Sequence, residues 1–387
     1  MMVAPVVRRL IEQYGPADRT GSLLDPFCGS GSALVEAMLH GMSSTGIDLN
    51  PFATRLAKVK TTPLAPVTLR RTFARVASDY DEAVPSEPDV DLPTLATWFS
   101  PKAVRDLSRL RSVIREVRPV ALRDFFELCL AETARYVSWT RRDEYKVFRI
   151  PEEKRRSWRP DVLASFTEIV ERNTTKMEDF VGRLRSEVPQ CSVVYGDVRL
   201  PGAIPDGGFD MIVTSPPYGD SRTTVAYGQF SSLSLAWLGY DRRVVNGIDR
   251  DSLGGVPSRR DATAPGSATL AKHLREIEAK DPTRAADVSS FYADLCIAFR
   301  NIANALAPGG RACVVVGNRT VKGVRLETDV ILSELFENEC GLVHQETIVR
   351  GIPNKVMPLR NSPTNVPGQQ GETMANEYIL VLERPNT

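Results

Sequence analysis

Short apolar runs alternate with amphipathic segments at the start of the chain. Residues 22–25 read as a strand leading into the loop CGSGS, and ALVEAMLH after it predicts a helix that ends at Gly41. A second strand is expected around 45–49, followed by a helix capped by Asn50 with Pro51 at its first position. This order of strand, helix, strand and helix predicts the first half of a doubly wound α/β sheet.

The pattern changes over residues 65–188, which we expect to form an insertion. Segments such as AVRDLSRLRSVIREV and ALRDFFELCLAETARYV carry apolar residues at helical spacing, without the alternation of strands. Strands resume at CSVVYGD and FDMIVTSPPY, and two more are expected near HQETIVR and EYILVLER. The polar stretch at about 219–285 has few periodic signals and predicts mobile loops. One α/β domain is therefore predicted in two parts, 1–64 and 189–387, interrupted by a largely helical insertion.

Composition is that of an ordinary soluble globular protein, with 42% hydrophobic and 25% charged residues. The formal net charge of +1 neither favours nor excludes a nucleic-acid partner, because such a partner requires local positive charge. No apolar run is long enough to span a bilayer, and the N-terminal segment does not resemble a signal peptide. With six scattered cysteines and three histidines, we expect a cytoplasmic protein with no metal site and no membrane contact.

A glycine loop between a strand and a helix, with an acid ending the next strand, is typical of a site for an adenosine-bearing ligand. Gly29 and Gly31 let the backbone approach a ligand, and Asp48 follows at about the twenty-residue spacing expected for an acid that binds ribose hydroxyls. The third glycine of a dinucleotide fingerprint, GxGxxG, is missing from this loop. Asp25, directly before the loop, would repel a pyrophosphate and suits a cationic ligand.

The segments DPFCGSG, GIDLNPFA and YGDVRL resemble, in this order, the cofactor motifs of amino-methyltransferases. TSPPY at 214–218 matches the catalytic pattern of the amino-group DNA methyltransferase family, whose members modify N4 of cytosine or N6 of adenine: Ser, Asn or Asp, then Pro-Pro, then an aromatic residue. The resemblance implies a Rossmann-like methyltransferase sheet and S-adenosylmethionine as cofactor, with Asp197 at its adenine amino group. The implied cofactor residues are Asp25, Phe27, Cys28, Gly29, Gly31, Asp48, Leu49, Asp197 and Val198.

The implied catalytic residues are Ser215, Pro216, Pro217 and Tyr218. An exocyclic amine is a poor nucleophile, because its lone pair is conjugated into the base. Ser215 Oγ and the backbone carbonyl near Pro216 can accept hydrogen bonds from it, and the prolines hold these acceptors in place. Tyr218 would stack on a flipped-out base. Serine at the first position is commoner in the cytosine-specific enzymes, so N4 of cytosine is the expected target and N6 of adenine the alternative.

Nine basic residues lie between Arg135 and Arg159, with four acids and five interleaved aromatic residues. Basic side chains can bind DNA phosphates, and Arg can read guanine edges; a solvated helical face is the alternative interpretation. The polar stretch after TSPPY begins beside the target base and supplies further candidates. The candidate DNA-contacting residues are Arg141, Arg142, Arg155, Arg156, Arg222 and Tyr227.

The resemblance also implies double-stranded DNA as substrate and a cognate restriction endonuclease as a candidate partner. One departure from the family concerns the motif that closes over the methionine end of the cofactor, normally upstream of the first motif. Here residues 1–9 or the C-terminal segment would have to supply it. The rival interpretations are an RNA or protein amino-methyltransferase and a catalytically silent nucleic-acid-binding module. Intact Asp25, Asp48, Asp197 and Ser215 count against the silent module.

Overall fold

The computed structural model describes residues 2–18, 20–84, 90–141, 147–205, 207–220, 226–256, 266–352, 360–361, 371–372 and 376–386. Its contacts divide the chain into two compact units. The first, called the sheet unit here, comprises residues 1–49, 189–224 and 250–387. The second, the helical unit, comprises residues 50–188 and 225–249.

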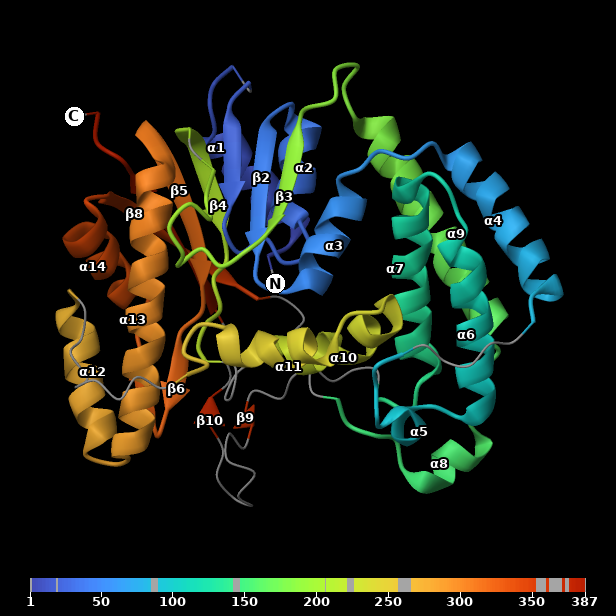
Figure 1. Cartoon of the computed structure of the whole chain (residues 1–387). Helices are drawn as coiled ribbons and strands as arrows, with labels where there is room; N and C mark the ends of the chain where they lie inside the picture. The colour runs from blue at the N-terminus through green and yellow to red at the C-terminus, as the bar shows by residue number, and fades with distance from the viewer. Residues whose placement is uncertain are drawn as a thin grey trace. The chain divides into compact units, whose positions relative to one another are not determined.

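The described part of the sheet unit contains a seven-stranded sheet in the order β3, β2, β1, β4, β5, β11, β8 (Figure 1). The strands from β3 to β5 pair in parallel, whereas β11 runs antiparallel to both of its neighbours. The chain winds outward from β1 to β3 and then returns to β4 on the other side of β1, which creates a topological switch point. The strands are β1 Ser22–Asp25, β2 Ser43–Asp48, β3 Cys191–Tyr195, β4 Phe209–Thr214, β5 Leu306–Val316, β8 Val343–Gly351 and β11 Asn376–Glu383.

Helices cover both faces of this sheet (Figure 1). Leu24 and Ile212 belong to a core cluster with residues of α12 Ala268–Glu278, α13 Pro282–Ala305 and α14 Thr328–Cys340. Their neighbours Leu23 and Met211 are also buried, on the opposite face, because successive strand residues alternate. The two remaining helices of the unit, which contact β1, β2 and β4, are α1 Ala4–Tyr14 and α2 Ser32–His40.

The first predicted elements are confirmed, and so is the Rossmann-like doubly wound fold. Gly41 ends α2 with a φ of 88°, a left-handed conformation that glycine adopts at little cost. The Asn50 side chain accepts a hydrogen bond from Phe52 N at 3.0 Å and so caps α3, with Pro51 at its first position. The shorter strands of the sheet unit are β6 Arg319–Val321, β7 Val324–Leu326, β9 Arg360–Asn361 and β10 Gly371–Glu372.

The helical unit is built around α7 Val120–Val137, which packs against α3, α6, α9 and α10. Trp237 of α10 is fully buried, edge-on to Phe99 at a ring separation of 5.7 Å. The other helices of this unit are α3 Pro51–Lys60, α4 Pro66–Glu82, α5 Leu95–Trp98, α6 Pro101–Arg115, α8 Glu152–Ser157, α9 Val162–Arg183, α10 Tyr227–Leu238 and most of α11 Arg242–Asp251. No described helix of either unit combines the length and apolar character needed to cross a membrane.

The expectation of loops at about 219–285 is wrong over most of the described residues. Helices α10, α11, α12 and the start of α13 lie there. The polar residues suggest loops, but several of them form hydrogen bonds within or at the start of helices. Ser231 Oγ donates to its own helix at Tyr227 O (2.8 Å), and Ser267 and Asp281 cap α12 and α13. The helical unit also begins at Asn50 rather than at residue 65 and takes in α10, because α3 and α10 both pack on α7.

Candidate active site

Two neighbouring strands, β1 and β4, bring the glycine loop and the TSPPY motif to the same edge of the sheet. Thr214 Oγ1, at the end of β4, donates a 2.7 Å hydrogen bond to Asp25 Oδ1, at the end of β1. The same oxygen accepts from Phe27 N at 3.2 Å. This edge is the switch point, where doubly wound folds bind their ligands.

Asp25 is a buried acid at this edge, with 2% of its surface exposed. Burial raises its pKa to about 7, although the hydrogen bonds from Thr214 and Phe27 act in the opposite direction. The folded protein therefore holds this proton more tightly than a free carboxyl group does. A cation bound beside it would favour the ionised form.

Asp25→Asn should change how stability depends on pH. The folded-state pKa lies above the value of 3.8 for a free carboxyl, so the folded protein holds this proton more tightly than the unfolded chain. The free energy of unfolding should then fall as pH rises from about 4 to about 7, and this contribution should be absent in Asp25→Asn. Urea denaturation of both proteins across this range measures the difference. Parallel curves for the two proteins would refute the assignment.

The glycine loop has an open side where a ligand could lie. Gly29 and Gly31 have φ angles of 49° and 74°, which glycine adopts without strain. A Cβ built on Gly29 would meet no heavy atom within 4 Å. Gly29 N donates to Asp48 Oδ2 at 2.8 Å, so the acid that ends β2 is held against the loop. Half-buried Leu49 follows it. An open glycine loop beside a strand-end acid fits an adenosine-bearing cofactor.

Three of the expected cofactor residues serve the core as well. Phe27 packs against the main core cluster, and Val198 belongs to that cluster, with 4% of its surface exposed. Cys28 is 5% exposed, and burial, with the nearby Asp48 and Asp25 carboxylates, raises the pKa of its thiol. The Cys28 thiol therefore stays protonated and is a poor nucleophile.

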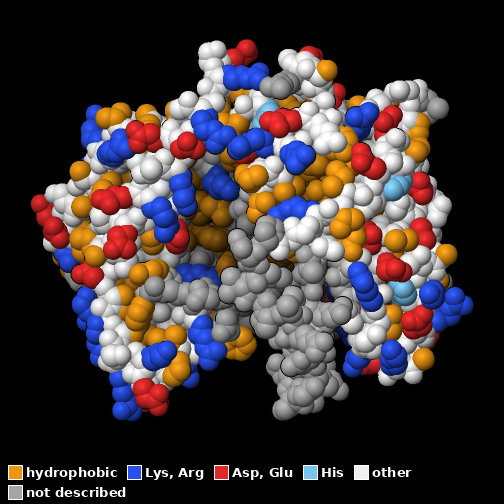
Figure 2. Space-filling model, turned by 180° about the vertical axis from the view of Figure 1, so that it is seen from behind, with side chains coloured by type: hydrophobic (Ala, Val, Ile, Leu, Met, Phe, Trp, Pro, Cys, Tyr) orange, Lys and Arg blue, Asp and Glu red, His pale blue; other side chains and the backbone are white. Residues whose placement is uncertain are grey.

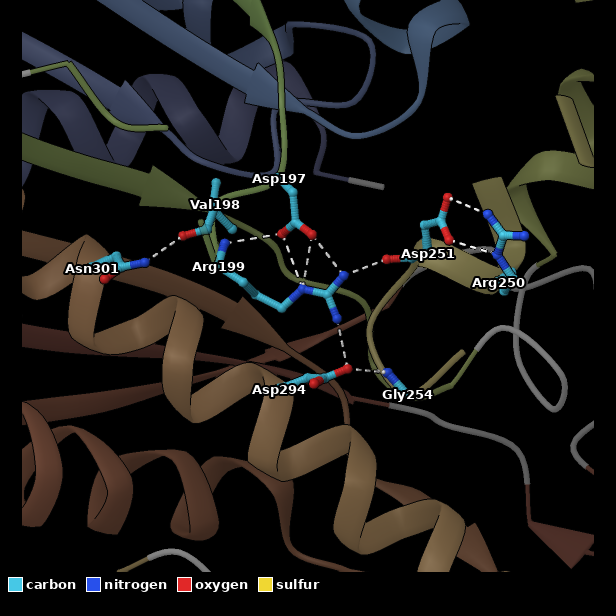
Figure 3. Close-up of polar contacts among 8 residues, drawn as sticks. All are labelled: Asp197, Val198, Arg199, Arg250, Asp251, Gly254, Asp294 and Asn301. Carbon is cyan, nitrogen blue, oxygen red and sulfur yellow. Dashed lines mark hydrogen bonds and ion pairs between the residues drawn. The ribbon is translucent and has the colours of Figure 1, made fainter. Parts of the chain in front are cut away.

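Asp197 is held by Arg199, which is not among the predicted site residues (Figure 3). Its Oδ1 accepts from Arg199 N and Nε, each at 3.0 Å, and its Oδ2 accepts from Arg199 Nε at 3.0 Å and Nη2 at 2.7 Å. Arg199 also donates to Asp294 Oδ2 at 2.8 Å and to the Asp251 carbonyl. Gly254 N donates to the same Asp294 oxygen at 2.9 Å. An adenine amine at Asp197 would thus have to share the carboxylate with Arg199.

In the TSPPY motif, a chain of polar atoms leads away from the serine. Ser215 Oγ donates to Tyr218 OH at 3.3 Å, and Tyr218 OH donates to Glu377 Oε1 at 3.4 Å. Pro216 is buried and Pro217 half-buried, while Tyr218 packs partly buried against the core cluster. Glu377 lies at the start of β11, 159 positions further along the chain, and no sequence signal connects it to the motif.

A buried ion cluster fixes the turn that follows the motif. Asp220 has no exposed surface, and its Oδ2 accepts from Arg284 Nη2 at 2.8 Å and from Arg319 Nη2 at 3.4 Å. Arg319 Nη1 also donates to the Tyr218 carbonyl at 3.5 Å, and Arg284 pairs with Asp287 at 3.0 Å. Burial lowers the pKa of Arg319. The turn after TSPPY is therefore anchored to α13 and β6.

The candidate DNA-contacting residues fall in different parts of the chain. Arg141 is exposed, with its guanidinium 5.8 Å from the Phe148 ring. Tyr227 begins α10 and is 44% exposed. Arg142 and Arg222 lie outside the described residues. On the face drawn in Figure 2, Lys and Arg side chains are interspersed with Asp and Glu.

Arg155 and Arg156 line a cavity of about 640 Å³ within the helical unit. The Arg155 guanidinium lies 5.5 Å from the Trp139 ring, and Glu152 pairs with Arg156 at 2.9 Å. The complete lining is Ser100, Pro101, Lys102, Ala103, Trp139, Glu152, Arg155, Arg156, Arg159, Pro160 and Asp161. Four basic residues against two acids make this lining net positive. Within the described residues, no three His, Cys, Asp or Glu side chains are grouped to hold a metal ion.

Comparison with known proteins finds relatives for the whole chain. The UPF0020 family, described as RMKL-like, methyltransferase domain, matches residues 11–85. Type II methyltransferase M.MvaI from Kocuria varians is 36% identical over 408 residues, which cover 99% of this chain and 89% of that protein. Type II methyltransferase M.BsoBI from Geobacillus stearothermophilus is 23% identical over 64% of this chain and 53% of its own length. Among solved structures, the rRNA methyltransferase aviRa from Streptomyces viridochromogenes aligns with 98% of this chain and 83% of its own, at 13% identity and a TM-score of 0.34.

Proposed function

The chain belongs to the amino-group DNA methyltransferase family, and on that premise we propose that it transfers a methyl group from S-adenosylmethionine to N4 of a cytosine flipped out of double-stranded DNA. The observation that carries the proposal is the juxtaposition at the switch point. The Thr214–Asp25 hydrogen bond ties the TSPPY motif to the glycine loop, so the residues for the two reactants share one edge of the sheet.

S-adenosylmethionine, when bound, supplies a methyl group activated by the positively charged sulfonium. Gly29 leaves room for it, and the Asp48 carboxylate would accept hydrogen bonds from its ribose hydroxyls. Asp25 would place a negative charge near its cationic end. Asp197, oriented by Arg199, would accept a hydrogen bond from the adenine amine on a lone pair that Arg199 does not occupy. The walls of the cofactor site would be completed by the backbone of Phe27, Cys28, Leu49 and Val198.

Ser215 and Pro216 would act on the target amine. Hydrogen bonds from the amine to Ser215 Oγ and to the Pro216 carbonyl localise the lone pair on nitrogen, which makes the amine a better nucleophile. Pro216 and Pro217 fix φ through the turn, so these acceptors need no rearrangement. The Tyr218 ring would stack on the flipped base and replace part of its lost base stacking.

N4 of cytosine is preferred over N6 of adenine because the motif begins with serine, which is commoner among the cytosine enzymes; adenine is the alternative. Methylation at carbon 5 of cytosine would need an accessible cysteine thiolate. Cys28 does not provide one, since it is buried, in the glycine loop, with a raised pKa. The Type II relatives support site-specific action on DNA and a cognate restriction endonuclease as partner of this modification activity.

The proposal is tested by offering the purified chain methyl-labelled S-adenosylmethionine together with genomic DNA, total RNA or denatured protein from one host. Label is expected in DNA alone, and Ser215→Ala should incorporate it far more slowly. Label in RNA or protein with none in DNA would favour the rival amino-methyltransferases.

DNA phosphates are expected to contact the basic residues of the helical unit, together with Arg141, Arg142, Arg222 and Tyr227. DNA affinity should fall with salt, because each neutralised phosphate releases counterions, with a slope of about −0.9 per phosphate in a log–log plot. Changing Arg155, Arg156 and Arg159 together to Gln should reduce the steepness of that slope by up to about 3. Fluorescence anisotropy over a salt series measures it.

A matched triple variant of exposed arginines outside the cavity, Arg70, Arg172 and Arg183 to Gln, controls for the change in net charge. It should leave the slope nearly unchanged. Equal slopes for the two triple variants would remove the cavity from the DNA-binding surface.

A further inference from the structure

Glu377 is a buried carboxylate with an unusual position for a strand residue. It is 8% exposed, at the start of β11, in a strand whose following residues are mostly core. Its two oxygens have different partners. Oε2 is paired with Arg350, the residue directly opposite on β8, and Oε1 accepts from Tyr218 OH at 3.4 Å. A buried ion pair is costly unless further hydrogen bonds satisfy the remaining lone pairs of the carboxylate, and Tyr218 OH supplies one of them.

The contact on Oε1 leads directly to the proposed catalytic serine. Ser215 Oγ donates to Tyr218 OH, and Tyr218 OH donates to Glu377 Oε1, so both hydroxyl protons point from the motif toward the carboxylate. Resting on the function proposed above, we propose that Ser215, Tyr218 and Glu377 form a proton relay that removes the surplus proton of the methylated amine, with Glu377 as its terminal acceptor.

The proton balance is simple. The amine nitrogen, once methylated, carries one proton too many and a positive charge. Its N–H bond breaks, the electron pair stays on nitrogen, and the proton passes to Ser215 Oγ. The serine hydroxyl proton moves to the Tyr218 oxygen, and the tyrosine proton moves to Glu377 Oε1. A cationic amine and a carboxylate become a neutral amine and a carboxylic acid, with no further reactant.

Arg350 positions the acceptor of this relay. As the charged partner of Oε2, it orients the Glu377 carboxylate, which leaves Oε1 toward Tyr218. Within the described residues, the charged or titratable groups that contact Glu377 are Arg350 from β8 and Tyr218 from the TSPPY motif.

Tyr218→Phe and Glu377→Gln test the relay separately from base stacking and folding. Each should lower the single-turnover methylation rate at least tenfold, as general-base contributions of about 10²–10⁴-fold allow. The double variant should be no slower than the slower single variant, because both changes interrupt one chain. Cofactor affinity by calorimetry, and base flipping followed by the fluorescence of 2-aminopurine at the target position, should stay as in the unaltered protein.

Tyr378→Phe and Glu346→Gln are matched controls, since Tyr378 OH contacts Arg325, and Glu346 accepts from Tyr14, away from the motif. Both should methylate at the unaltered rate. A Tyr218→Phe protein with full rate and normal flipping, or effects that multiply in the double variant, would overturn the relay and leave the proposed function standing. Absence of any DNA methylation by the unaltered chain would overturn the proposed function, and the relay with it.

Discussion

Asp220→Ala is expected to lower the free energy of unfolding by about 3–5 kcal/mol, because it leaves two guanidinium groups, 12% and 13% exposed, without their shared buried carboxylate. Asp220 has no exposed surface, and Arg284 and Arg319 both donate to its Oδ2. Arg319 also donates to the Tyr218 carbonyl. Loss of the Asp220 carboxylate should therefore make the turn after TSPPY less well ordered and reduce the methylation rate of the folded protein. Urea denaturation gives the stability change.

Asp287→Ala provides the comparison for Asp220→Ala. Asp287 pairs with Arg284, and its side chain is 11% exposed whereas that of Asp220 is fully buried, so its loss should cost clearly less than the loss of Asp220. Equal unfolding midpoints for Asp220→Ala and the unaltered protein would show that the cluster does not anchor the turn.

Ser215→Ala is expected to lower the methylation rate by about 10²–10³-fold, the effect of removing one preorganised hydrogen-bonding group that acts in the transition state. The affinity for S-adenosylmethionine should barely change, since the glycine loop and Asp48 are untouched. Single-turnover kinetics and calorimetry separate these two effects. Ser232→Ala, at a half-buried serine on α10 whose Oγ donates to its own helix, is the matched control and should keep full activity. A Ser215→Ala protein with unaltered rate would remove the serine from the mechanism.

Much of residues 22–60 could be predicted from the sequence because the signals there are local. The run from 22 to 25, the glycine at 41 and the Asn50-Pro51 pair each specify a strand, a helix end or a cap through neighbouring residues alone. The helices between 226 and 285 were missed because their serines and acids resemble loop residues until tertiary packing on α7 or on the sheet buries the apolar ones.

The supporting residues of the candidate site escaped prediction for a different reason. Asp220 is joined to Arg284 across 64 positions, and Tyr218 to Glu377 across 159. The order of the strands in the sheet brings these partners together, and local sequence patterns do not specify that order. Arg284 and Glu377 do not belong to any recognisable motif. Arg199 lies only two residues after Asp197, but its role depends on a hydrogen bond to Asp294 of α13, a partner far away in the sequence.

The atom that receives the methyl group distinguishes the candidate reactions most directly. Double-stranded DNA incubated with the purified chain and S-adenosylmethionine can be digested to nucleosides and analysed by mass spectrometry against authentic standards. We expect N4-methyldeoxycytidine, and far less of it with Ser215→Ala over the same reaction time. N6-methyldeoxyadenosine alone would contradict the choice of base, and 5-methyldeoxycytidine would contradict the mechanism as well.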